Sequence, residues 1–384
     1  MSAAGRLTPE GLRIGTLAGV PVLVARSWLV IAAVVTYLFA PTVAASAPGL
    51  GAWSYLVAFG YAVLLLLSVL LHELAHAVAA RAFGMPATHI VINLWGGHTQ
   101  FETDAVRPGR SFVIAVVGPL ANAVLALLAA PLLLADLPDV ARLLVWAFVL
   151  TNGVVAVFNL VPGLPLDGGR LLEALVWKLT SDRTTGTVVA AWGGRLVAAA
   201  VIGWGLLPLL SGRIDLVRVV WAVLIGGLLW SGAGHVLRGA SIRRRAPEAT
   251  VHRLARPAVP LPASVSVADA LAAAGVSHPA DLGRTTVLLL GEAGQPVGVL
   301  DPGAASQVPP ERRASVPASA AARAFADGVV LDVRLGGEEL LRLLGTLRGE
   351  EWPVRDEAGH WVGVLRGGDV VAALVGSRPA RRRR

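Results

Sequence analysis

Three residues in an apolar stretch have the types and spacing of a metal site. The segment His72-Glu73-Leu74-Ala75-His76 lies in a mostly apolar run from about 53 to 82. If this run is helical, the two histidines lie one turn apart, so both imidazoles project from one face and can bind one metal ion. Glu73 could accept a proton from a water molecule at that metal. Ionisable groups are costly in a membrane segment, which makes these residues functional candidates.

The composition indicates a protein with several membrane spans. The 384 residues are 55% hydrophobic and 15% charged, with a mean hydropathy of +0.67, which excludes an ordinary soluble protein. Because there are no cysteines, a transition-metal site must use His, Asp or Glu. The net charge of +8 comes almost entirely from arginine, since Lys178 is the only lysine. We expect the basic clusters to contact lipid headgroups and fix topology, with no nucleic-acid binding.

Six apolar runs are long enough to cross a bilayer as helices, which needs about 20 residues each. They cover residues 27–46, 53–82, 112–135, 142–163, 187–210 and 217–237. The expected fold is therefore an α-helical polytopic membrane protein with six transmembrane helices and a C-terminal soluble α/β unit. The expected parts are an interfacial hairpin segment (1–26), a membrane-embedded core (27–237), a polar linker (238–255), the α/β unit (256–378) and a basic tail (379–384).

Flanking basic residues predict the orientation, because Lys and Arg concentrate on the cytoplasmic side. One side carries Arg6, Arg13, Arg26, Arg81, Arg107, Arg110, Arg170, Lys178, Arg183, Arg238 and Arg243 to Arg245. The other side carries Arg142, Arg213 and Arg218. We therefore expect a multi-pass protein of the cell membrane with both termini in the cytoplasm. His72 then lies roughly 28 Å along an inward-running helix, toward the cytoplasmic face.

A broken helix offers the third metal ligand. The fourth run ends in Asn159-Leu-Val-Pro-Gly-Leu-Pro-Leu-Asp167-Gly-Gly-Arg170, whose prolines and glycines must end the helix. Irregular backbone at membrane depth is tolerated where it is buried in protein or lines a watery cavity. A zinc hydrolase needs three protein ligands and an open position, so Asp167 would complete the pair of histidines. The alternative is that Asp167 only caps a helix beginning near Arg170.

Two further segments each allow two interpretations. Residues 84–111 read as two short strands around a turn at Gly96-Gly97; they are either a plain surface hairpin or an edge strand that pairs with an unwound substrate. His98 in this hairpin is a surface residue or an additional ligand. Asn122, in the third run, either binds substrate or hydrogen-bonds between helices.

Together these motifs resemble the site-2 protease family of intramembrane metalloproteases. The resemblance rests on the His72–His76 motif, on Gly118-Pro-Leu-Ala-Asn122, and on Asn159…Pro162…Pro165…Asp167-Gly168, and it covers roughly residues 10–237. It implies that His72, His76 and Asp167 bind one Zn²⁺, that Glu73 is the general base, and that Asn159 helps to position substrate or the oxyanion. It also implies hydrolysis within a transmembrane segment during regulated intramembrane proteolysis. Substrates in such pathways include anti-sigma factors and other single-span proteins.

The C-terminal unit has two similar halves, each predicted as helix, strand, tight turn, strand and helix. It resembles a tandem pair of cystathionine-β-synthase-type (CBS) domains. The resemblance implies adenine-nucleotide binding with Asp369 on the ribose. However, the hydroxyl residue expected three places earlier is Arg366, and the matching position of the first half is Ala304. At most one nucleotide site is therefore expected, and a structural or homodimerising role is the alternative.

A membrane metal transporter gated by the CBS-like pair is the competing functional hypothesis. It would account for His and Asp within the membrane, but it needs no glutamate next to the first histidine. It would also place polar residues in several spans rather than at one level.

Overall fold

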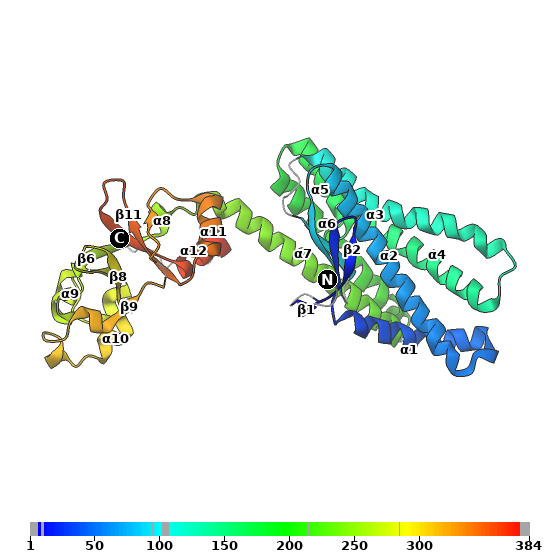
Figure 1. Ribbon diagram of the computed structural model, residues 1–384, viewed down its shortest axis with the longest axis horizontal. Helices are drawn as coiled ribbons and strands as arrows, with labels where there is room; N and C mark the ends of the chain where they lie inside the picture. Colours follow the sequence, from blue (N-terminus) through cyan, green and yellow to red (C-terminus); the bar gives the residue numbers. More distant parts are fainter. Residues whose placement is uncertain are drawn as a thin grey trace, which may run out of the picture. The chain divides into compact units, whose positions relative to one another are not determined.

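The computed structural model describes residues 7–8, 11–93, 96–101, 107–212, 215–283, 285–326 and 328–376. The chain divides into two compact units, residues 1–237 and 238–384, the first mainly helical and the second built around a sheet (Figure 1). The basic tail 379–384 lies outside the described residues, as do Arg6 and Arg213 from the orientation argument.

Long apolar helices form most of the first unit. They are α1 (Trp28–Ser46), α2 (Ser54–Ala82), α3 (Pro108–Ala129), α4 (Asp139–Asn159), α6 (Arg183–Leu206) and α7 (Leu216–Arg245). Among the described residues, six helical stretches are long and apolar enough to cross a membrane, and each overlaps one expected run. Two ends differ from expectation: α4 stops at Asn159, before the proline-glycine break, and α7 continues past 237 to Arg245.

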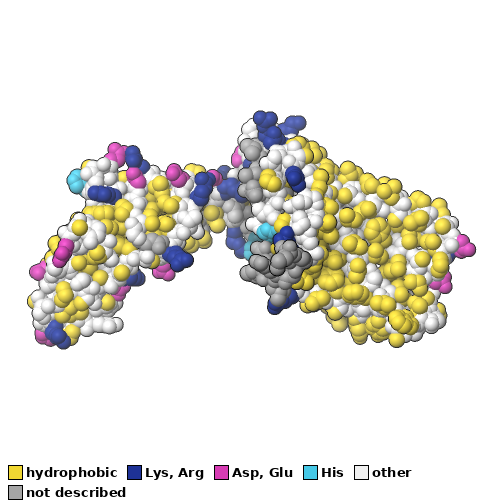
Figure 2. All heavy atoms as spheres, in the orientation of Figure 1, with side chains coloured by type: hydrophobic (Ala, Val, Ile, Leu, Met, Phe, Trp, Pro, Cys, Tyr) yellow, Lys and Arg dark blue, Asp and Glu magenta, His cyan; other side chains and the backbone are white. Residues whose placement is uncertain are grey.

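The surface of these helices is apolar. Leu127, Leu128 and Leu196 are 72%, 73% and 71% exposed, which would be unfavourable in water and is expected against lipid tails. Figure 2 shows hydrophobic side chains over most of the visible face of the helical unit, with Lys and Arg gathered toward one end. The arrangement is that of a membrane-embedded bundle with one basic end.

A five-stranded sheet joins two segments that are distant in sequence. Its strand order is β1 (Leu7–Thr8), β2 (Gly11–Leu17), β3 (Val20–Val24), β4 (Ala87–Asn93) and β5 (Gly96–Phe101). Both expected hairpins form, but the parallel pairing of β3 with β4 was not predicted. The expected turn at Gly96-Gly97 is wrong: these residues belong to β5, opposite Asn93 and Ile92. Strand β5 lies at the edge of this sheet.

The broken segment leads into a short amphipathic helix, α5 (Asp167–Thr180), which starts three residues before Arg170. Glu173 is buried and accepts a hydrogen bond from the Thr187 hydroxyl of α6 at 2.8 Å. The side chain of Asp182 caps α6 by accepting from the Thr184 and Thr185 amides. The hydrogen bond between Glu173 and Thr187 joins α5 to α6 and so helps to fix the position of Asp167.

The second unit is a seven-stranded sheet with two similar halves. Its strand order is β10 (Leu331–Asp332), β11 (Glu351–Arg355), β12 (Trp361–Arg366), β6 (Arg256–Pro262), β7 (Thr286–Leu290), β8 (Pro296–Leu300) and β9 (Ala322–Ala324). Its helices are α8 (Val251–Leu254), α9 (Val267–Ala273), α10 (Pro302–Gln307), α11 (Gly337–Thr346) and α12 (Gly367–Val375). In each half a first strand pairs in parallel with a second strand, which pairs antiparallel with a third.

The stretch expected to be a linker, 238–255, is ordered. It begins in α7, and Ala246, Ala249 and Val251 are buried in the hydrophobic core of the half that contains α11 and α12. Small apolar residues among the arginines therefore make part of this stretch a component of the folded unit.

Candidate metal centre

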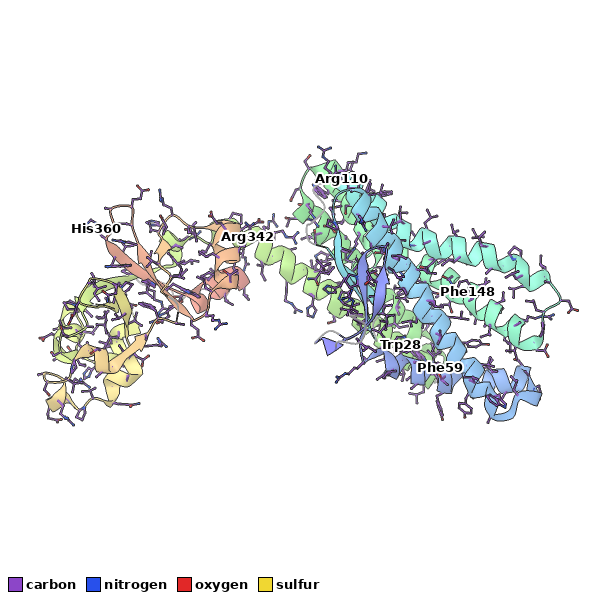
Figure 3. All side chains as sticks on the ribbon, viewed as in Figure 1. Trp28, Phe59, Arg110, Phe148, Arg342 and His360 are labelled. Atoms are coloured by element: carbon purple, nitrogen blue, oxygen red, sulfur yellow. The ribbon has the colours of Figure 1, made fainter. Side chains whose placement is uncertain are left out.

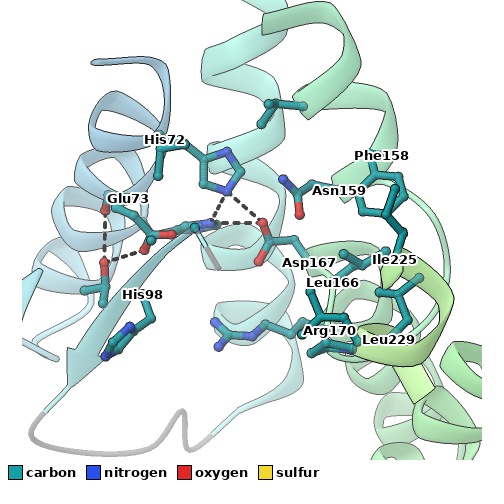
Figure 4. A pocket seen from close by; sticks show the side chains of 18 residues that line it. His72, Glu73, His98, Phe158, Asn159, Leu166, Asp167, Arg170, Ile225 and Leu229 are labelled. Atoms are coloured by element: carbon teal, nitrogen blue, oxygen red, sulfur yellow. Dashed lines mark hydrogen bonds and ion pairs between the residues drawn. The ribbon is translucent and has the colours of Figure 1, made fainter. Parts of the chain in front are cut away.

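Two histidines of α2 and the first residue of α5 meet at one point (Figure 4). The His72 and His76 Nε2 atoms are 3.1 Å apart, and they lie 2.9 and 3.2 Å from Asp167 Oδ2. All three side chains are buried. A tetrahedral zinc with bonds near 2.05 Å would separate its ligand atoms by roughly 3.3 Å. The three atoms thus have close to the spacing that one zinc ion requires.

Both imidazoles are held so that their Nε2 atoms face this point. Nδ1 of His72 lies 2.6 Å from Asn122 Oδ1, and Nδ1 of His76 lies 2.6 Å from the Ile114 carbonyl oxygen. A carbonyl oxygen can only accept, so each Nδ1 carries the hydrogen and each Nε2 keeps its lone pair. Such outer partners commonly fix the tautomer and orientation of metal-binding histidines.

Asn122 belongs to a buried polar network rather than to the cavity. Its amide nitrogen donates to Asn152 Oδ1 at 2.7 Å and to the Ser68 carbonyl at 3.3 Å, while Asn152 donates to the Ser68 hydroxyl oxygen at 2.9 Å. All three residues are fully buried. The structure places Asn122 in hydrogen bonds between helices, as in the alternative interpretation, and its expected contact with substrate stays a prediction. Sequence reasoning missed Ser68 and Asn152, although polar residues within apolar spans could have drawn attention to them.

At Gly118, which has no side chain, the backbone of α3 lies close to the two imidazoles. A Cβ atom at Gly118 would lie 2.7 Å from His72 Nε2 and closer still to His76 Nε2. Any other residue at Gly118 would therefore occupy the space in which the three ligand atoms converge.

Glu73 is held by the edge strand of the sheet. Its Oε2 accepts a hydrogen bond from the Thr99 hydroxyl of β5 at 2.7 Å. A Cβ atom at Gly97 would come within 2.9 Å of Glu73 Oε1, so glycine allows the strand to pass directly over the carboxylate. No local pattern pointed to Thr99, because Glu73, its neighbour in space, is 26 residues away along the chain.

These groups line a cavity of about 520 Å³. Its polar wall includes the three converging side chains, Glu73, His98 and Asn159, and the β5 segment Gly96–Thr99. Its apolar lining includes Phe158, Leu228 and Leu229. In Figure 4 the Asn159 amide faces the same space as His72 and Asp167. The cavity thus combines a metal-binding constellation, a carboxylate and an exposed strand edge.

In the second unit, the expected nucleotide contact Asp369 is engaged by an arginine. Arg256 of β6 donates to both carboxylate oxygens of Asp369, from Nε at 2.7 Å and from Nη2 at 2.8 Å. This hydrogen-bonded pair raises the pKa of Arg256 above its ordinary value. A ribose at Asp369 would have to displace Arg256, so the contact weakens the nucleotide expectation.

Comparison with known proteins gives matches over the membrane part and over the whole chain. The profile of Peptidase family M50 matches residues 60–139 and 134–201. A candidate zinc metalloprotease of Synechocystis sp. is 27% identical over 97% of this chain and 98% of its own length. Rip3, a candidate zinc metalloprotease of Mycobacterium tuberculosis, is 36% identical over 58% of each chain.

Two solved structures are similar at low TM-scores. The site-2 protease from Methanocaldococcus jannaschii is 23% identical, with a TM-score of 0.43 over 59% of this chain and 94% of its own. The CBS domain of a bacterial CNNM/CorC-family Mg²⁺ transporter is 18% identical, with a TM-score of 0.29 over 44% of this chain and 99% of its own.

The family match spans α2, α3, α4 and α5, the helices that carry the converging histidines, Asp167 and the buried network. Over residues 60–201 the chain is therefore similar to peptidase family M50, and its zinc metalloprotease relatives together with its six span-length helices indicate a membrane-embedded zinc metalloprotease.

Proposed function

We propose that His72, His76 and Asp167 bind the zinc ion and that Glu73 is the general base for peptide hydrolysis. The observation that carries this proposal is the spacing of the three ligand atoms, 2.9 to 3.2 Å, with both Nδ1 atoms already hydrogen-bonded. When bound, zinc supplies a Lewis acid that polarises a carbonyl and acidifies water. The residues of the chain must then position the substrate and move the protons.

Glu73 moves the proton in this mechanism. Its carboxylate takes a proton from the attacking water and delivers it to the leaving amine nitrogen. The Thr99 hydroxyl, 2.7 Å from Oε2, keeps the carboxylate turned toward the cavity and leaves Oε1 to accept the water proton. Asn159, at the end of α4 and on the cavity wall, would donate from its amide to the substrate carbonyl or the developing oxyanion.

The substrate is an unwound transmembrane segment of another protein, bound as an added strand on β5. A helical segment keeps its carbonyls in intrahelical hydrogen bonds, so its backbone must extend locally before water can attack. Strand β5 is at the sheet edge, and its residues Gly96–Thr99 line the cavity beside Glu73. Main-chain pairing with β5 would therefore present a substrate peptide bond next to the general base.

The orientation is proposed from the distribution of charge, and the biological setting from the resemblance to site-2 proteases. We propose that both termini are cytoplasmic, supported by the described arginines toward one end of the bundle (Figure 2). The protease then acts from the cytoplasmic side on single-span signalling proteins, such as anti-sigma factors, in regulated intramembrane proteolysis. The CBS-type unit would regulate this activity or pair two copies of the chain.

The test is cleavage of a co-expressed single-span substrate in membranes by the Glu73→Gln variant. We expect full zinc content and no cleavage, because Gln keeps the size of the side chain but cannot accept the water proton. His76→Gln should lose both zinc and cleavage. Cleavage by Glu73→Gln at the wild-type rate would refute the role of Glu73. Uptake of metal into vesicles without any cleavage would instead favour the competing function, a metal transporter.

A further inference from the structure

A second cavity, of about 540 Å³, lies where α2 ends, α3 begins and α5 ends. The side chains around it include Phe83, Val113, Arg107, Arg110 and Lys178. Figure 3 places Arg110 at the end of the helical unit beside α5. This second cavity is separate from the catalytic cavity, because the two share no lining residue.

The charge around this cavity is entirely positive among the described residues. Arg107 directly precedes α3, Arg110 lies in its first turn and Lys178 lies in the last turn of α5, and the described lining contains no acidic residue. Arg110 contacts Phe83: its guanidinium lies 5.8 Å from the ring centroid and donates to the Phe83 carbonyl oxygen at 3.4 Å. Because α3 begins at Pro108, its N-terminus adds partial positive charge. Glu102 and Asp104 lie outside the described residues.

Apolar side chains adjoin these cations. Val113 is 41% exposed in the cavity wall, and its neighbour Phe112 is 45% exposed. On α5, Leu175 and Leu179 are 50% and 76% exposed beside Lys178. A free anion would gain nothing from this apolar surface, whereas an amphiphile would contact both parts.

We propose that this cavity binds the headgroup of an anionic phospholipid of the phosphatidylglycerol type. The phosphate lies among Arg107, Arg110 and Lys178, and the acyl chains extend along Val113 and the exposed leucines of α5. Basic pockets between transmembrane helices at the cytoplasmic face suit such headgroups, and Arg can hold a phosphate through two parallel hydrogen bonds. Scattered basic residues that only set topology would not need a shared cavity.

The unique lysine allows a direct test on the full chain. The protein is placed in nanodiscs of phosphatidylcholine with or without phosphatidylglycerol, and modification of Lys178 by an amine-reactive reagent is followed by mass spectrometry. An Arg26→Lys variant provides an exposed reference lysine at the start of α1, which reports any general effect of the anionic surface. We expect phosphatidylglycerol to slow modification of Lys178 several-fold more than that of the lysine introduced at 26. Equal slowing at both lysines would overturn the proposal.

Binding should also depend on the two arginines. At about fivefold per cationic residue, Arg107→Gln with Arg110→Gln should weaken retention of phosphatidylglycerol in native mass spectrometry by roughly 25-fold. Arg26→Gln with Arg243→Gln removes the same charge elsewhere and should change retention little. Equal losses in the two double variants, or equal protection of Lys178 by millimolar inorganic phosphate, would contradict a lipid site. None of these measurements requires cleavage, so their outcome is independent of the proposed catalytic roles.

Discussion

Replacement of Asn122 by Leu should weaken zinc binding although Asn122 does not reach the ligand atoms. The side chain of Asn122 accepts the Nδ1 hydrogen of His72 at 2.6 Å, and Leu has similar size but no acceptor. The imidazole would then be free to rotate or to carry its hydrogen on Nε2, the atom that faces Asp167. Loss of such an outer partner typically lowers metal affinity 10- to 100-fold, about 1.4–2.7 kcal/mol.

The same substitution should reduce stability by a separate amount. It leaves His72 Nδ1 and Asn152 Oδ1 without their buried partners, and each unsatisfied group costs about 1–3 kcal/mol. The expected decrease in the free energy of unfolding of the zinc-free protein is therefore about 2–6 kcal/mol. Zinc affinity must be measured well below the melting temperature, so that the loss reflects the folded site.

The assay is competition for zinc with a chromophoric chelator in detergent. Two variants serve as controls: Asn122→Asp keeps an acceptor for His72 and should retain zinc within about threefold of wild type, whereas Asn159→Leu alters the cavity wall without touching either histidine. A wild-type zinc affinity for folded Asn122→Leu would refute the argument that this hydrogen bond orients His72.

Three further perturbations have equally defined outcomes. Thr99→Val should lower kcat for a membrane substrate about tenfold with unchanged zinc content, because the carboxylate of Glu73 loses its hydrogen bond. Thr99→Ser keeps the hydroxyl and should retain the wild-type rate. A wild-type kcat for Thr99→Val would show that the hydrogen bond is dispensable. Gly118→Ala should abolish zinc binding, since its methyl group would meet both imidazoles. Gly153→Ala, with open space around it, should retain zinc. Zinc bound to Gly118→Ala would contradict the close approach of the α3 backbone to the two histidines. Asp369→Ala should destabilise the C-terminal unit by about 1–3 kcal/mol, more than Asp356→Ala, as judged by thermal unfolding of the full chain. Equal effects would mean that the pair with Arg256 contributes little.

The sequence was sufficient to predict the spans and the groups of the candidate centre. Residue spacing along a helix places His72 and His76 on one face, and the proline-glycine break limits where Asp167 can lie. The six apolar runs were recovered because hydrocarbon thickness sets their minimum length.

What the sequence did not reveal depends on contacts between distant segments. Thr99 meets Glu73 only because β5 is carried by a sheet that also contains β3, and no local pattern encodes the parallel pairing of β3 with β4. Asn122 and Asn152 have the same residue type as Asn159, yet two are fully buried and the third lines the cavity. Helix rotation within the bundle decides between these environments, and the apolar runs are too uniform to specify that rotation.

The separation of the converging residues along the chain has a consequence for biosynthesis. Asp167 follows His72 by 95 residues and His76 by 91, and two further helices, α3 and α4, lie between them. At a synthesis rate of about 5–20 residues per second, the histidines emerge roughly 5–19 s before the aspartate. During that interval the nascent chain carries an incomplete ligand set beside Glu73. The proposed three-ligand centre can therefore form only after Asp167 has been made, so under this proposal the new chain has no complete centre while its first spans enter the bilayer.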